Sequence, residues 1–107
     1  MDVDVARAAG LFADQTRADV VAALLDGRAL TAGELARAAG VSAQTISSHL
    51  HRLLDAGLLA VEAQGRHRYY RLVDERTARA FEALAALAPV RQAGSVRQPQ
   101  VAAALRV

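Results

Sequence analysis

Residues 41–72, VSAQTISSHLHRLLDAGLLAVEAQGRHRYYRL, contain a helical pattern followed by a hairpin pattern. The helical pattern begins at Ser42, a residue type that caps helix N-termini, and runs to about Asp55. Gly57 stands just past that point, and glycine readily adopts the left-handed backbone that often follows a helix. The sequence therefore predicts a helix over residues 42–55.

Two short strand patterns follow this helix. Residues 58–62 and 67–73 contain apolar, β-branched and aromatic side chains, and Gln64 and Gly65 occupy the expected turn between them. A turn of this length joins antiparallel strands. We therefore expect a two-stranded hairpin directly after the helix.

The helix over residues 42–55 should have two different faces. Ile46, Leu50 and Leu53 recur on one stripe, with Leu54 at its edge, and this stripe is expected to face the core. The other side carries small hydrogen-bonding side chains: Gln44, Thr45, Ser47, Ser48 and His51. A solvated face would also be polar, but it usually carries acidic and basic pairs. Because no charged residue precedes Arg52 in the helix, the pattern favours a helix that reads DNA bases.

The hairpin turn is basic. On one strand, Arg66 and Arg68 would share a face, and His67 would point to the other face. Arginines at such a tip can grip phosphates or enter a narrow minor groove. A charged hairpin could serve solubility alone, but beside the polar helix it favours DNA binding. Tyr69 and Tyr70 should also alternate, with one of them in the core.

His49 and Arg52 lie at the margins of the polar face. His49 is near the buried edge of the apolar stripe, so we expect a partly buried hydrogen-bonding residue rather than a base reader. Arg52 lies further along the helix and could reach the DNA backbone. All three histidines of the chain thus belong to the expected reading helix and hairpin.

Helical spacing predicts two helices at the start of the chain. The first covers residues 2–13. Thr16 can cap the second helix, which ends at Asp26 and Gly27. These helices are rich in alanine, so each buries a modest apolar area.

Two further helices are marked by their end signals. Thr31 and Glu34 have capping-box spacing, and Gly40 can close the helix that they begin. Asp74 can cap the last helix, which Pro89 stops. The helix after the capping box is expected to bury Leu35, Ala38 and Ala39.

The predicted element order is α-α-α-α-β-β-α, a mainly α fold with a small β-hairpin. The third and fourth helices would form a helix-turn-helix, and the hairpin would be a wing. A chain of 107 residues fits one domain. We expect this winged helix domain over residues 1–88, with a linker and the start of a possible further C-terminal helix over residues 89–107.

Composition narrows the function further. Acidic residues outnumber arginines in residues 1–41, arginines prevail in residues 42–107, and the chain has no lysine. A basic half suits an acidic partner such as nucleic acid. The chain has no cysteine, so disulfides and thiolate metal sites are excluded. No apolar run approaches the ~20 residues that span a bilayer, and the N-terminus is unlike a signal peptide, so we expect a cytoplasmic protein without a membrane partner.

Three pieces of the chain resemble the ArsR/SmtB family of bacterial winged-helix transcriptional repressors. They are FADQTRADVVAALLDG, LTAGELARAAGVSAQTISSHLHRLLDAGLL and GRHRYYRL, in the family's order and spacing over roughly residues 8–88. The resemblance implies a homodimer that binds a palindromic double-stranded DNA operator and is released by a signal. It implies DNA contacts by Gln44, Thr45, Ser47, Ser48, His51, Arg66 and Arg68. We also expect Ser42 and Arg52 to contact the DNA.

The same resemblance implies that the first and last helices join the two copies. With only two phenylalanines and two tyrosines available for the core, dimerisation should add needed burial. The apolar positions of these helices, and hence the expected interface residues, are Val5, Ala8, Ala9, Phe12, Phe81, Leu84, Ala85, Leu87 and Ala88.

The chain departs from the metal-sensing members of that family. Their thiol-bearing helix pattern is replaced here by residues 34–39, ELARAA, and residues 74–88 contain no histidine. Because the borderline metals prefer imidazole and thiolate ligands, we expect no metal site and no cofactor. The small-molecule effector is unknown. Residues 95–107 resemble the lead into a further helical region of longer members, which suggests either a shortened chain or a naturally short form.

The sequence also bears on two other classes of function, an interaction module and an enzyme. A winged helix can serve as a protein–protein interaction module without sequence-specific DNA binding, with the alanine-rich helices as its working surface. An enzyme is not expected, because the sequence contains neither a metal cluster nor a phosphate-binding glycine loop. Ser47, Ser48 and His49 are adjacent, but neighbours on a helix diverge and would not form a nucleophile–base pair.

Overall fold

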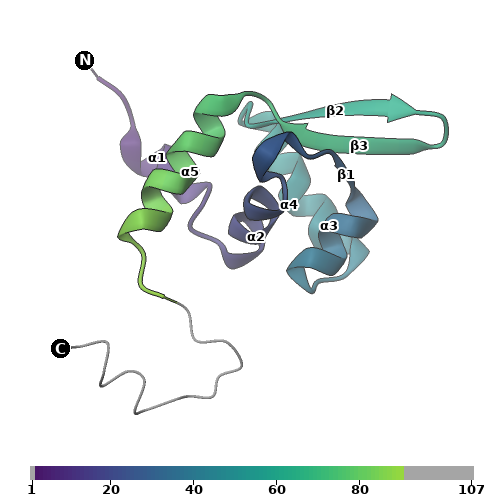
Figure 1. The fold of residues 1–107 in the computed structure, drawn as a ribbon, viewed down its shortest axis with the longest axis horizontal. Helices are drawn as coiled ribbons and strands as arrows, with labels where there is room; N and C mark the ends of the chain where they lie inside the picture. Colours follow the sequence, from purple (N-terminus) through teal and green to yellow (C-terminus); the bar gives the residue numbers. More distant parts are fainter. Residues whose placement is uncertain (1, 91–107) are drawn as a thin grey trace, which may run out of the picture.

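The computed structural model describes residues 2–90 and contains five α-helices, one 3₁₀ turn and three strands in that range (Figure 1). The predicted linker and C-terminal helix lie almost wholly outside the described residues. The elements are α1 (Val5–Gly10), α2 (Gln15–Ala23), η1 (Leu25–Gly27), β1 (Leu30–Thr31), α3 (Ala32–Ala39), α4 (Ala43–Asp55), β2 (Leu59–Gln64), β3 (His67–Leu72) and α5 (Glu75–Leu87).

Polar side chains fix where the helices begin. Thr31 and Glu34 form the predicted capping box at α3, and Ser42 accepts a hydrogen bond from the Thr45 amide at α4. The predicted Asp74 cap of α5 is also confirmed. The predicted cap of α2 was wrong. Asp14 holds that position, with the Arg17 amide 3.1 Å from its carboxylate, and Thr16 lies inside the helix.

The segment after α2 is more irregular than the sequence suggested. The helix ends at Ala23, and a 3₁₀ turn follows in which Asp26 and Gly27 both have positive φ. The two-residue strand β1 comes next, and the sequence analysis did not predict it. Both departures make a tight connection that brings α3 against the sheet.

The sheet has the order β1-β3-β2, with antiparallel pairing throughout. Gln64 pairs with His67, so the two-residue turn is Gly65 and Arg66, one residue later than predicted. Gly65 has a φ of 59°, which glycine adopts without steric cost. Arg66 belongs to this turn and therefore does not share a strand face with Arg68. The expectation of a shared face was wrong.

The core lies where α2, α3 and α4 meet the base of the hairpin. Ile46, Leu50 and Leu53 of α4 are at most 2% exposed, which confirms the predicted inward stripe. On α3, Leu35 and Ala36 are buried, whereas Ala38, which was expected inside, is exposed. The other core residues are Val20, Val21, Leu24, Leu59 and Leu72.

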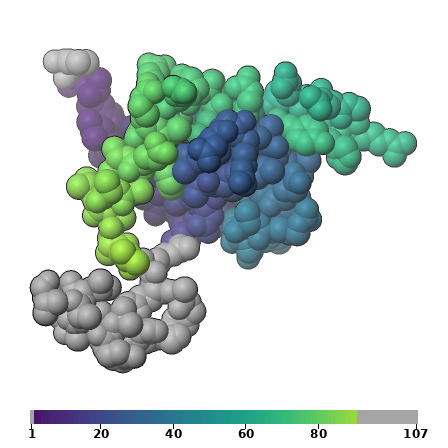
Figure 2. All heavy atoms as spheres, in the orientation of Figure 1, coloured from purple at the N-terminus to yellow at the C-terminus, as the bar shows by residue number. Residues whose placement is uncertain are grey.

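The hairpin and the helices α1 and α5 lie at opposite ends of the molecule (Figure 1). The space-filling view shows the hairpin as a narrow arm beyond the helical body (Figure 2). Tyr70 packs against the core, and Tyr69 is partly exposed on the other face of the strand beside His67, which agrees with the expected alternation. The arm is therefore free to reach a partner that lies along the helical body.

Backbone amides hold three helix-capping carboxylates in their charged form. The Arg17 amide lowers the pKa of Asp14, and the Thr31 amide lowers the pKa of Glu34. At Asp74, partial burial acts to raise the pKa, but the amides and an arginine in the first turn of α5 lower it more. A depressed folded-state pKa adds stability above the unfolded-state value, and this stability is lost as pH falls through the folded-state value.

We therefore expect the free energy of unfolding to fall progressively below about pH 5. Urea unfolding at several pH values would measure this decline. In the triple variant Asp14→Asn, Glu34→Gln and Asp74→Asn the slope with pH should be shallower, because amides do not titrate. An unchanged slope in that variant would show that other carboxyls cause the acid sensitivity.

Candidate nucleic-acid interface

The outward face of α4 is exposed along its first three turns. Gln44, Thr45, Ser47, Ser48 and His51 all lie on the exposed side, as the helical pattern predicted. Within residues 2–90, the side chains of Gln44, Ser47 and Ser48 make no hydrogen bond to the protein. Their donors and acceptors are therefore available to an external partner.

Two local contacts order this face. The Ser42 hydroxyl lies 3.1 Å from both the amide and the hydroxyl of Thr45, so these two side chains stabilise the start of α4. Nδ1 of His51 lies 2.9 Å from the Ser47 carbonyl oxygen. Because a carbonyl can only accept, Nδ1 carries the hydrogen, and Nε2 of the neutral ring is left as an acceptor that faces solvent.

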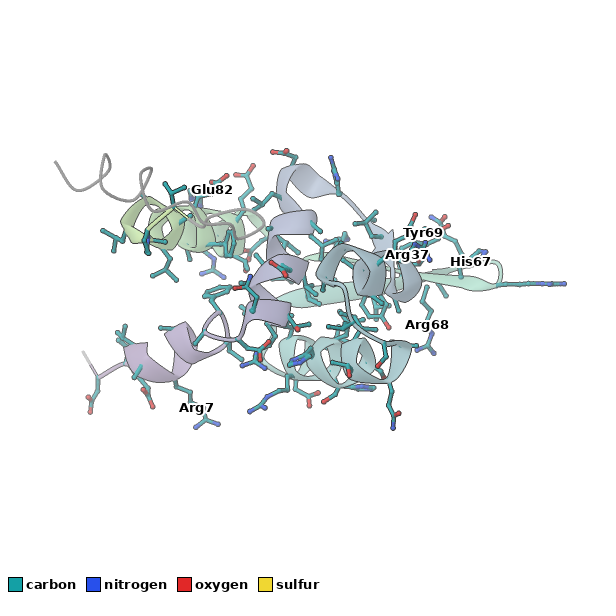
Figure 3. All side chains as sticks on the ribbon, turned by 90° about the horizontal axis from the view of Figure 1, so that it is seen from below. Arg7, Arg37, His67, Arg68, Tyr69 and Glu82 are labelled. Atoms are coloured by element: carbon teal, nitrogen blue, oxygen red, sulfur yellow. The ribbon has the colours of Figure 1, made fainter. Side chains whose placement is uncertain are left out.

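The arginines of the hairpin extend this surface. Figure 3 shows Arg68 on the side of the hairpin that α4 occupies, and His67 and Tyr69 on the opposite side. His67 packs edge-to-face on Tyr69, with ring centroids 6.2 Å apart. Arg66 is exposed in the turn at the end of the arm. The structure thus brings Arg68 towards the polar face of α4 and places Arg66 beyond it.

Arg7 of α1 was not predicted to belong to this surface. It projects on the same side of the molecule as α4 and Arg68 (Figure 3). It also lines a cleft between α1 and the end of α4 together with Arg52. In the sequence, Arg7 is one arginine within an alanine-rich helix, and nothing there indicates on which side it would lie.

His49 is partly buried and hydrogen-bonded, as predicted. Its Nδ1 lies 3.1 Å from Nη1 of Arg17, and its Nε2 lies 3.8 Å from the Asp14 carboxylate. Arg17 is 9% exposed. The role of this arginine was not predicted from the sequence. The signal that could have indicated it is the position of Arg17 in the ADQTR segment, next to a helix cap.

The apolar positions of α1 and α5 differ in exposure. Phe12 and Phe81 contact each other edge-to-face, with centroids 5.9 Å apart, and both pack against the core. Val5, Leu84 and Leu87 are 68%, 40% and 83% exposed. Ala9 is half-buried, and Ala8, Ala85 and Ala88 are exposed. The two phenylalanines therefore bury much of their surface within one copy of the chain. The aliphatic residues leave an apolar face exposed.

No group of three or more histidine, aspartate or glutamate side chains within residues 2–90 is placed to hold a metal ion. In the same range, every helix is too short or too polar to cross a membrane. Within the part of the chain that the structure describes, α4 and the hairpin form a surface that carries both unpaired polar groups and arginines.

A helix-turn-helix followed by a projecting hairpin, which forms a three-stranded sheet with the short strand before the helix-turn-helix, defines a winged helix-turn-helix domain. A family model described as a helix-turn-helix domain matches residues 12–62. The chain is similar to winged helix-turn-helix transcriptional regulators, and its structural neighbours include members of the ArsR family. The proteins that it matches are transcriptional regulators, which are not enzymes.

Individual relatives support this assignment. The HTH-type transcriptional regulator YdfF of Bacillus subtilis, itself called uncharacterized, is 42% identical over 98 residues, which are 92% of this chain and 43% of YdfF. The HTH-type transcriptional regulator CmtR of Mycobacterium tuberculosis is 38% identical over 77 residues, 72% of this chain and 64% of CmtR. The chain thus spans less than two thirds of the length of either relative.

A solved structure agrees in fold. The DNA-binding domain of Mb0332 from Mycobacterium bovis, described as homodimeric and as part of a possible ArsR-family regulator, superposes with a TM-score of 0.69 at 29% identity. The match covers 78% of this chain and 76% of that domain. These similarities favour a DNA-binding regulator over a winged helix used only for protein–protein interaction.

Proposed function

We propose that this chain binds a palindromic operator as a homodimer and represses transcription until a signal releases it. The observation that carries the proposal is the outward face of α4, where unpaired hydrogen-bonding groups are exposed and acidic side chains are absent from Ser42 to His51. A recognition helix needs such a face in the major groove, because base edges are read by direct hydrogen bonds.

Each side chain of the face has a chemically suitable target. Gln44 can pair with the edge of adenine, and the hydroxyls of Ser47 and Ser48 can reach bases or phosphates. The Thr45 methyl can contact a thymine methyl, and Nε2 of His51 can accept from a base amino group. Ser42 at the helix start and Arg52 further along are assigned to phosphates.

The hairpin would follow the DNA away from the major groove. Arg66 at its end is assigned to the minor groove or to the phosphates beside it, and Arg68 to the phosphates nearer α4. Arg7 projects on the same side as Arg68, so it is a candidate for a phosphate contact between the two half-sites (Figure 3). These contacts would position the recognition helix and add affinity without specifying a sequence.

The uncovered faces of α1 and α5 are proposed as the dimer interface. Val5, Leu84 and Leu87 are exposed apolar side chains at the end of the molecule opposite the hairpin (Figure 1). A two-fold axis at that end would place two recognition helices on one side of the dimer. Half-sites about 34 Å apart would then be read on one face of the duplex. The resemblance to the Mb0332 domain, which is homodimeric, supports this arrangement.

The releasing signal is proposed to be something other than a metal held by thiolates or histidines. The chain has no cysteine, and its three histidines lie on α4 and the hairpin. The site of action would be the cytoplasm, where bacterial DNA lies.

A titration of fluorescent duplexes at low salt tests the proposal. Fragments from the DNA upstream of the protein's own gene, searched for an imperfect palindrome, are the natural probes. Saturable binding that weakens steeply with salt is expected, because phosphate contacts release counterions. Absence of saturable binding to any fragment would favour the protein–protein interaction module instead.

Arg66→Ala should weaken binding to operator and unrelated duplex alike and should lower the slope of log affinity against log salt by about 1 per copy. The reason is that one phosphate contact is lost without loss of a base contact. Arg28→Ala, which removes an exposed arginine outside the proposed surface, is the matched control and should leave the slope unchanged. Equal slopes for the Arg66 variant and wild type would remove Arg66 from the DNA surface.

A further inference from the structure

Arg17 is a buried cation tied to the end of α1. It is 9% exposed, its Nε donates to the Leu11 carbonyl at 2.8 Å, and its Nη2 donates to the Gly10 carbonyl at 3.2 Å. Carbonyls at a helix C-terminus lack partners within the helix, and a cation there is favourable. The guanidinium therefore fixes the end of α1 to the start of α2.

The third arm of the same guanidinium reaches the recognition helix. Nη1 of Arg17 lies 3.1 Å from Nδ1 of His49, whose side chain is 18% exposed. A guanidinium only donates, so Nδ1 must accept, and the ring must be neutral with its hydrogen on Nε2. Nε2 lies 3.8 Å from Oδ1 of Asp14, so its hydrogen faces a carboxylate. A chain of polar groups thus joins α1, the start of α2 and the middle of α4.

We infer that Arg17 is a positioning residue for DNA recognition, which acts through neutral His49 to hold α4 at a fixed orientation relative to α1. The inference rests on the proposed function, in which α1 forms part of the dimer interface and α4 reads the bases. His49 lies directly after Ser48 in the reading helix, so the bond acts at the level of the proposed base contacts. It would relate the two reading helices of a dimer to each other.

Protonation of His49 would break this connection. A protonated Nδ1 has no lone pair with which to accept a hydrogen bond from Arg17. Protonation would also place two cationic groups 3.1 Å apart. Asp14 is the facing carboxylate, and its pKa is lowered, so it stays charged and would draw the imidazolium away from Arg17. The other charged groups nearby are those of the cleft that Arg17 also lines, namely Asp4, Arg7, Arg52 and Asp55. Histidine is the side chain type whose charge most often changes between pH 5 and pH 8, so the test compares DNA discrimination across that range.

The test measures the ratio of affinities for two duplexes of equal length, one selected from a randomised pool by the wild-type protein and one scrambled. In wild type this ratio should fall about tenfold between pH 8 and pH 6, the size of one hydrogen bond to a charged group. In His49→Asn, whose amide oxygen can take the place of Nδ1, the ratio should change less than about twofold. His51 and His67 are present in both proteins, so they do not account for the difference.

Arg17→Lys should show the low ratio already at pH 8, because an ammonium cannot span all three acceptors. The inference is overturned if His49→Asn loses discrimination at pH 6 as wild type does, or if wild type shows no pH dependence. If Arg17→Lys fails to fold, the comparison of His49→Asn with wild type still tests the inference. If wild type selects no duplex at pH 8, the proposed DNA-reading function itself fails, and that result is distinct from the others.

Discussion

Replacing Leu53 with alanine should lower the free energy of unfolding by about 2–5 kcal/mol. Leu53 is completely buried on α4, in the core shared by α2, α3 and the base of the hairpin. Truncation removes apolar contacts and leaves a cavity that close-packed neighbours fill only in part. For a domain of this size, such a loss is a large fraction of the total stability.

Urea unfolding followed by circular dichroism would measure the change, at one fixed protein concentration because a dimer is stabilised by mass action. Val3→Ala is the matched control, since Val3 is 63% exposed and lies before α1. Its effect should be within about 0.5 kcal/mol. A loss below about 1 kcal/mol for Leu53→Ala would contradict the packing of α4 against the core.

The double variant Leu84→Glu, Leu87→Glu should convert the dimer to monomers at micromolar concentration. Both side chains are exposed in the single copy, so the folded monomer should tolerate the change. At the proposed interface, the carboxylates would have to lose their hydration without a partner, which is costly. Affinity for a palindromic duplex should then fall about 100-fold or more, because the second half-site no longer binds within the same complex.

Analytical ultracentrifugation and duplex titration would measure the two effects on the same samples. Val61→Glu is the control for oligomeric state, because Val61 is 40% exposed, like Leu84, but lies on the hairpin. That variant should remain dimeric. A double variant that also remains dimeric would place the interface elsewhere than on α5.

Local sequence signals were sufficient for most of the fold. Ser42, Thr31 with Glu34, and Asp74 predicted three helix starts, because their hydrogen bonds are made within four residues. The inward stripe of α4 was predictable for the same reason, since helical periodicity decides it. The start of α2 was less certain, because Asp14 and Thr16 are both suitable caps and lie two residues apart.

The parts that the sequence did not predict depend on distant contacts. The strand β1 has only two residues and exists because Leu30 and Thr31 pair with β3, far along the chain. The burial of Arg17 runs against the usual exposure of arginine. It follows from the end of α1 and from His49, which tertiary structure brings together. The register of the turn at Arg66 likewise depends on the pairing of the two strands.

The candidate reading surface is a mixed case. The polar side of α4 could be predicted from periodicity and from the absence of charge, and the structure confirms that it is exposed. The side of the hairpin on which Arg68 lies, and the position of Arg7, required the three-dimensional arrangement (Figure 3).

Base readout by α4 is the central claim, and one measurement tests it most directly. Titration of the selected palindromic duplex and of a scrambled duplex should be compared for wild type, Gln44→Ala and Ser48→Ala. Each variant should bind the palindrome more weakly by about 1–3 kcal/mol, which is the discrimination of a good base contact, and bind the scrambled duplex as wild type does. Equal losses on both duplexes, or no loss on either, would contradict the claim that these side chains read the sequence.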